Sequence, residues 1–185
     1  MRAQRIGYFG GSFNPLHFGH IFAASYALLK FPLDQIWIVP SYQHPWGKKL
    51  VSFEHRYNMC QEAFSGLGSS FQVSNWEQSE DLDGKTIHSL EKASQQHPKS
   101  HFSLIMGSDL VHESSSWHRF SDLKKQFPIY IVPRTQDLNP EHFTIPDISS
   151  SALRQSISQQ KDKSWTAQVP LSVQEYIEAH QLYQA

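Results

Sequence analysis

The sequence predicts an α/β protein built on a Rossmann-like parallel sheet with helices on both faces. Short apolar runs alternate along the chain with segments whose apolar residues recur at helical spacing. The runs are dominated by Ile, Val, Phe and Leu, which is typical of parallel strands buried on both faces. We expect strands over residues 6–9, 35–39, 71–74, 102–106 and 129–132. We expect helices over residues 19–30, 53–65, 86–96, 121–126, 150–160 and 172–181.

Residues 1–185 are predicted to form a single domain. A chain of 185 residues with 39% hydrophobic content can bury a sizeable core, and no linker interrupts it. The net charge of −1 gives no reason to expect nucleic acid as a partner. The first strand begins within a few residues of Met1, and no apolar stretch is long enough to cross a bilayer, so we expect a cytoplasmic protein without a membrane partner. The sequence leaves a homo-oligomer open.

The segment over residues 10–20 is predicted to bind phosphate. Gly10 and Gly11 follow the first strand and let the backbone approach a ligand closely. A helix then begins, and its first N–H groups and positive dipole end favour an anion. His17 and His20 lie on one face of the first turn, where they can add protonated donors. The alternative is a glycine turn with two packing histidines, but the combination of features favours a nucleotide phosphate site.

The loop after the second strand is basic and aromatic. It contains Trp46, Lys48 and Lys49, and Arg56 follows in the first turn of the next helix. Because ligands bind at the carboxyl ends of parallel strands, this loop and those after residues 9, 106 and 132 should converge on one crevice. Lys48 or Lys49 is therefore a candidate phosphate ligand, and an ordinary solvated loop is the alternative.

The fourth predicted strand ends in Gly107-Ser-Asp109 at the same edge. Gly107 permits close approach of a ligand, and the Asp109 carboxylate suits ribose hydroxyls or a helix N-terminus. Further along, Ser150 and Ser151 suit a helix cap, and Arg154 lies one turn on, on the face of Ser151. Backbone N–H groups, hydroxyls and a guanidinium together can hold a polyphosphate.

These motifs resemble the nucleotidyltransferase superfamily, whose signature is Gly-x-Phe-x-Pro-x-His-x-Gly-His, and within it the bacterial nicotinate-nucleotide adenylyltransferases. The resemblance covers nearly the whole chain, because the first, fourth-strand and C-terminal motifs appear in order. It implies catalytic roles for His17, His20, Lys48 and Arg154. It implies an ATP site formed by Gly10, Gly11, Ser12, Phe13, His17, His20, Gly107, Asp109, Ser150, Ser151 and Arg154. It implies contacts to a pyridine mononucleotide from Asn14, Lys48, Arg56, Thr86 and Trp117.

Two positions near Thr86 depart from the family pattern. The family has Tyr-Thr-x-Asp-Thr-Leu there, whereas Lys85 replaces its tyrosine and His88 its aspartate. The choice between a nicotinate and a nicotinamide substrate is therefore open at these residues. The loop at Lys48 also departs, since the family's Pro-Pro-His-Lys run is replaced by His-Pro-Trp-Gly-Lys.

The implied reaction joins two nucleotides through a pyrophosphate. A phosphate of the pyridine mononucleotide attacks the α-phosphorus of ATP, and because that phosphate is already ionised near neutral pH, positioning and charge neutralisation dominate. Mg²⁺ is expected to arrive with ATP, since the sequence shows no carboxylate cluster for a dedicated metal site.

Three alternatives stay open at this stage. The first is an adenylyltransferase for nicotinamide mononucleotide or phosphopantetheine. The second is a non-catalytic nucleotide-binding protein on the same fold. The third is a zinc protein, suggested by 11 histidines, although Cys60 is the only cysteine and most histidines lack ligand spacing.

Overall fold

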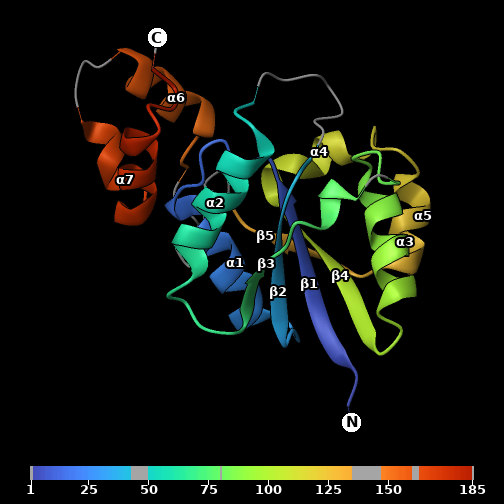
Figure 1. Ribbon diagram of the computed structural model, residues 1–185. Coiled ribbons are helices and arrows are strands. Elements are labelled where there is room, and N and C mark those ends of the chain that lie inside the picture. The colour runs from blue at the N-terminus through green and yellow to red at the C-terminus, as the bar shows by residue number, and fades with distance from the viewer. Residues whose placement is uncertain (1, 43–49, 80, 135–146, 160–162, 185) are drawn as a thin grey trace.

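A computed structural model describes residues 2–42, 50–79, 81–134, 147–159 and 163–184. Its centre is a parallel sheet of five strands in the order β3-β2-β1-β4-β5 (Figure 1). Strand β1 (Gln4–Gly11) lies in the middle and pairs with β2 (Gln35–Pro40) on one side and β4 (Ser100–Gly107) on the other. Strands β3 (Phe71–Val73) and β5 (Ile129–Val132) form the two edges. The predicted strands and their parallel arrangement are confirmed.

Helices cover both faces of the sheet (Figure 1). Helices α1 (Phe18–Lys30), α2 (Phe53–Phe64), α6 (Ser150–Gln159) and α7 (Leu171–Ala179) share one hydrophobic core. Helices α3 (Thr86–Gln96) and α5 (Phe120–Gln126) share a second core on the opposite face. The structure adds a one-turn helix, α4 (Val111–Ser114), and 3-10 turns at Trp76–Gln78, Ser108–Leu110 and Ser164–Gln168, all too short to show a periodic pattern.

Alternation along β1 connects the two cores. Ile6 and Tyr8 point into the core with α3, whereas Phe9 points into the core with α1. Gly7 allows the close packing between them, since a Cβ there would lie 2.5 Å from the Cδ1 atom of Ile105. The centre of the sheet that leads to the β1–α1 loop is therefore closely packed.

The strand order reverses between β1 and β4. The chain proceeds from β1 to β2 and β3 in one direction and from β4 to β5 in the other. In such sheets the loops beyond the carboxyl ends of the two central strands diverge to opposite faces and leave a crevice for a ligand. The N-terminus of α1 opens onto this edge. Within the described residues, no helix combines the length and apolar character that crossing a membrane requires.

Candidate functional site

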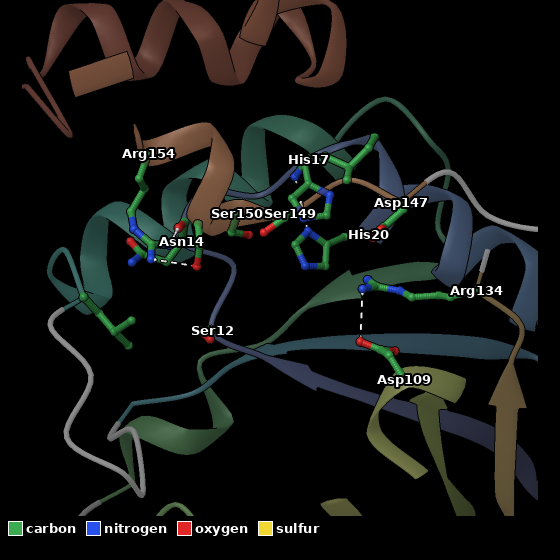
Figure 2. A pocket seen from close by; sticks show the side chains of 13 residues that line it. Ser12, Asn14, His17, His20, Asp109, Arg134, Asp147, Ser149, Ser150 and Arg154 are labelled. Carbon is green, nitrogen blue, oxygen red and sulfur yellow. Dashed lines mark hydrogen bonds and ion pairs between the residues drawn. The ribbon is translucent and has the colours of Figure 1, made fainter. Parts of the chain in front are cut away.

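A cavity of about 630 Å³ lies at the carboxyl edge, between the β1–α1 loop, the turn after β4 and the start of α6 (Figure 2). Eight residues predicted from the sequence line it, namely Ser12, Asn14, His17, His20, Asp109, Ser150, Ser151 and Arg154. Five lining residues were not predicted, namely Leu50, Arg134, Asp147, Ile148 and Ser149. Segments far apart in the chain thus meet in one polar cavity of a size that suits a nucleotide.

His17 and His20 form a stacked pair at the start of α1. Their ring centroids are 3.7 Å apart with the planes inclined by 25°. The backbone N–H of His17 donates to Nδ1 of His20 at 3.2 Å. A neutral His20 ring therefore carries its proton on Nε2, where it remains a donor. The edge contact of His20 with Phe13, at 4.9 Å between centroids, fixes the ring orientation further.

Both histidines are neutral at pH 7 in this structure. Burial, with a smaller contribution from the Arg134 charge, lowers the pKa of His17 to about 3. Burial, His17 and Arg134 also hold the pKa of His20 well below its usual value. Without a ligand the two rings are therefore neutral N–H donors, and the expectation of protonated donors stays a prediction for the nucleotide-bound protein. A polyanion in the cavity would raise both pKa values by its charge.

The β1–α1 loop (residues 12–17), called the phosphate loop after its predicted ligand, owes its shape to packing and to a residue with left-handed backbone conformation. Phe13 has φ +46°, which is unusual for a bulky side chain. A Cβ on Gly11 would lie 3.1 Å from the Phe13 ring, and one on Gly10 would lie 3.1 Å from the Tyr8 ring. Both glycines belong to the end of β1 and are not among the described residues that line the cavity. Their small size makes room for protein rings, and the ligand contact predicted for them stays a prediction.

The start of α6 is tied to the phosphate loop. Arg154 Nη1 donates to the carbonyl oxygen of Asn14 at 2.6 Å, and its Nη2 donates to Ser151 Oγ at 3.1 Å. Ser150 Oγ donates to the carbonyl oxygen of Pro15 at 3.0 Å. The guanidinium is thereby oriented at the wall of the cavity.

Asp109 and Arg134 form an ion pair on the side of the cavity near the histidines (Figure 2). Arg134 Nη1 lies 3.2 Å from Asp109 Oδ2, and the Arg134 backbone N–H donates to Ser108 Oγ at 2.9 Å. A Cβ on Gly107 would lie 2.3 Å from Asp109 Oδ1, so this glycine lets the carboxylate fold back over the strand end. Sequence reasoning missed Arg134, although it lies just after β5, in a loop predicted to reach the crevice.

Arg56 is buried behind the phosphate loop. It is 1% exposed, its Nε donates to the Val51 carbonyl at 3.1 Å, and its Nη1 donates to the Ser12 carbonyl at 3.0 Å. It is not among the described residues lining the cavity. The structure thus gives Arg56 a supporting position instead of the predicted direct contact with the pyridine nucleotide.

Comparison with known proteins places this chain in a family. A model of the cytidylyltransferase-like family matches residues 8–156. A probable nicotinate-nucleotide adenylyltransferase of Anaeromyxobacter dehalogenans (strain 2CP-C) is 34% identical over 187 residues, covering 97% of each chain. The chain belongs to the nicotinate-nucleotide adenylyltransferase family. A probable family member of Myxococcus xanthus (strain DK1622) is 31% identical, covering 98% of this chain and 95% of the relative.

Solved structures show the same fold at lower sequence identity. The Plasmodium falciparum nicotinic acid mononucleotide adenylyltransferase complexed with NaAD superposes with a TM-score of 0.77 and 22% identity, covering 97% of each chain. A nicotinate-nucleotide adenylyltransferase structure from Vibrio parahaemolyticus gives a TM-score of 0.77 at 19% identity, covering 98% of this chain and 96% of the other. The Rossmann-like architecture is thus shared with adenylyltransferases of this family.

The residues predicted for the pyridine ring lie on the other helical layer. Thr86 begins α3, and Trp117 packs edge-to-face on Phe120 with centroids 6.0 Å apart. Neither is among the described residues lining the cavity. Nearby, Asp83 accepts hydrogen bonds from Lys85 Nζ at 2.8 Å and from His88 Nδ1 at 3.0 Å.

The Asp83 carboxylate is ionised near neutral pH. Although burial works against it, the hydrogen bonds from Lys85 and His88 lower the pKa of Asp83 to about 2. The two departures from the family pattern therefore pair with one carboxylate at the start of α3. Lys48 and Lys49 lie outside the described residues, and the role predicted for them stays a prediction.

Proposed function

We propose that the protein transfers the AMP moiety of ATP to nicotinate mononucleotide, giving deamido-NAD and pyrophosphate. The observation that carries this proposal is the cavity in which the N-termini of α1 and α6 meet two imidazoles and two guanidiniums. Helix N-termini, Arg side chains and imidazole N–H groups are all donors to phosphate. Membership in the nicotinate-nucleotide adenylyltransferase family supports the reaction class and the acceptor.

The triphosphate of ATP is held by the loop and helix ends around the cavity. The Ser12 and Phe13 backbone, Ser150, Ser151 and Arg154 bind its oxygens. Asp109 binds the ribose hydroxyls, and this exchanges its ion pair with Arg134 for hydrogen bonds to the sugar. Arg134, once released, adds a guanidinium to the phosphates beside the histidines.

The chemical step is an in-line displacement at the α-phosphorus. An ionised phosphate oxygen of nicotinate mononucleotide forms the new P–O bond, the bond to the β-phosphate oxygen breaks, and pyrophosphate leaves. No side chain needs to remove a proton. His17 and His20 donate hydrogen bonds to the transferred and leaving phosphates, where charge accumulates in the transition state.

A magnesium ion is proposed to arrive with ATP and to neutralise part of the triphosphate charge. The described carboxylates that line the cavity are Asp109 and Asp147. Within the described residues, no group of three or more His, Cys, Asp or Glu side chains is placed to hold a metal. These residues fit an ion carried by the nucleotide better than a resident one.

Pyrophosphate release tests this proposal. The purified protein is incubated with ATP and Mg²⁺ and, separately, with nicotinate mononucleotide, nicotinamide mononucleotide or phosphopantetheine. Preference for the nicotinate substrate supports the proposal. Preference for the nicotinamide form would retain the chemistry and change the acceptor. ATP binding without release with any acceptor would overturn the enzymatic reading in favour of a nucleotide-binding protein.

A further inference from the structure

Asn14 is the point at which four chain segments meet. Its carbonyl oxygen accepts the hydrogen bond from Arg154 in α6. Its side-chain Oδ1 accepts from the Tyr183 hydroxyl at 2.9 Å and from the Val51 backbone N–H at 3.4 Å. Asn14 is 1% exposed and still contributes to the lining of the cavity. One residue of the phosphate loop is thus held by α6, by the segment after α7 and by the segment before α2.

These contacts fix the orientation of the Asn14 amide. Because Oδ1 accepts from the Val51 N–H, which can only donate, a rotation of the amide by 180° would place the Nδ2 donor against that N–H. Nδ2 has no hydrogen-bond partner among the described residues. A buried donor without a partner costs free energy, so its retention at the lining of a phosphate cavity points to an acceptor on the ligand.

The segment that carries Tyr183 is itself firmly held. Leu182 is 8% exposed in the main core, and its N–H donates to the Ile177 carbonyl at 3.0 Å, which closes the end of α7. Tyr183 has φ +63°, a left-handed conformation that a bulky residue adopts at a cost. Phe13, next to Asn14, has φ +46°. Both segments of the chain therefore adopt unfavourable backbone conformations where they meet.

The Tyr183 hydroxyl keeps its proton and can act only as the donor in this contact. Burial raises the pKa of Tyr183, although the charges of Arg154 and Arg56 oppose the shift. A protonated phenol is the partner that Oδ1 requires, since an amide oxygen can only accept a hydrogen bond. The Tyr183 hydroxyl and the Arg154 guanidinium thus both bind Asn14, which connects the end of α7 to the cavity.

We propose that Tyr183 is a positioning residue for phosphate transfer. Its hydroxyl locks Asn14 so that the Asn14 carbonyl holds Arg154 against the cavity and Nδ2 can donate to a phosphate of the bound nucleotides. The inference rests on the proposed function for its catalytic readout. It predicts that the α7 end, which contributes no described residue to the cavity lining, controls the reaction through a single hydroxyl.

The test compares Tyr183→Phe with a matched control, Tyr176→Phe. Tyr176 lies in α7, and its hydroxyl is also hydrogen-bonded, to Asn58 Nδ2 at 3.0 Å and His55 Nδ1 at 3.1 Å. Each substitution removes one hydrogen-bonded tyrosine hydroxyl, so both should lower Tm by about 2–4 °C. Only Tyr183→Phe should lower kcat/KM for nicotinate mononucleotide, by about tenfold, because only its hydroxyl orients the phosphate site.

A double-mutant cycle with Asn14→Ala identifies the route. If Tyr183 acts through Asn14, Tyr183→Phe should cause no further loss of kcat/KM in the Asn14→Ala background. Equal losses in both backgrounds, wild-type kcat/KM in Tyr183→Phe, or the same loss in Tyr176→Phe would each overturn the proposal.

ATP affinity separates this inference from the proposed function. Calorimetric titration with ATP needs no acceptor, and Tyr183→Phe should weaken ATP binding about fivefold while Tyr176→Phe leaves it unchanged. A wild-type protein inactive with nicotinate mononucleotide but with this pattern of ATP affinity would refute the acceptor and support the role of Tyr183. Unchanged ATP affinity in Tyr183→Phe would overturn the positioning role whatever the acceptor.

Discussion

Replacement of His20 by asparagine tests the roles of its two ring nitrogen atoms separately. The Oδ1 atom of asparagine can take the place of Nδ1 and keep the 3.2 Å hydrogen bond from the His17 N–H. The Nε2 donor and the ring are lost. The first turn of α1 should therefore survive, while the phosphate site loses one donor.

The structure sets the expected size of each effect. The two shortest ring contacts that would be lost are the stack on His17 at 3.7 Å and the edge contact with Phe13 at 4.9 Å. Ring contacts of this kind contribute about 0.5–1.5 kcal/mol each, so the free energy of unfolding should fall by about 1–3 kcal/mol. Loss of a donor aimed at transition-state charge lowers kcat by about 100- to 1000-fold.

The assay is steady-state pyrophosphate release with both substrates varied, alongside urea unfolding. His20→Gln is the matched control, since its amide nitrogen reaches toward the Nε2 position while the acceptor for His17 is lost. We expect His20→Gln to retain more turnover than His20→Asn despite equal or greater loss of stability. If His20→Asn kept kcat within threefold of wild type, His20 would serve only the fold, and the assignment of the donor would be refuted.

Three further predictions concern the same cavity. Arg154→Lys should lower ATP affinity almost as much as Arg154→Ala, because an ammonium cannot bond the Asn14 carbonyl and a phosphate in the same planar fashion; calorimetry with ATP checks this, and rescue by lysine would contradict it. Asp109→Asn should raise the KM for ATP at least threefold but shift Tm by less than about 2 °C, since its ion pair with Arg134 is partly exposed and such pairs contribute about 0–1 kcal/mol. Below pH 6.5 the unfolded chain binds a proton at His17 that the folded protein excludes down to about pH 3, so the free energy of unfolding should fall by about 1.4 kcal/mol per pH unit between pH 6 and pH 4. Urea unfolding measures this free energy for wild type and His17→Asn, and its slope against pH should be smaller in the variant. Equal slopes would contradict the low pKa.

The sheet was predictable because its signal is local. Each strand is a short apolar run, and the alternation with helices limits the topologies to a parallel sheet. The ends of the strands and helices were less predictable. Gly10 and Gly11 continue β1 instead of forming a turn, because β2 extends far enough to pair with them as far as Pro40. The predicted helix over residues 172–181 ends two residues early, since Gln181 adopts φ +50° and closes the helix.

The direction of long side chains was not predictable. Arg56 and Arg154 have similar sequence contexts, each in the first turns of a helix near the crevice. Arg154 lines the cavity, whereas Arg56 turns inward to the carbonyls of Ser12 and Val51. The difference arises from which carbonyl oxygens lie unpaired next to each helix, and a one-dimensional pattern does not contain that information. Arg134 was missed for the same reason, although its place after β5 was a usable signal.

Burial, with a smaller contribution from the Arg134 charge, keeps the two histidines of the cavity neutral by lowering their pKa values. A neutral imidazole still presents an N–H donor to an anion, and the guanidiniums of Arg134 and Arg154 supply the positive charge at the cavity. Asp109 offsets the charge of Arg134, and in the proposed complex a ribose competes for the carboxylate. In that proposal, binding of the sugar increases the positive potential at the phosphates. In this arrangement recognition of the nucleoside and stabilisation of the transferred phosphate are coupled through a single ion pair, so Asp109→Asn should alter kcat as well as KM, and an effect on KM alone would disprove the coupling.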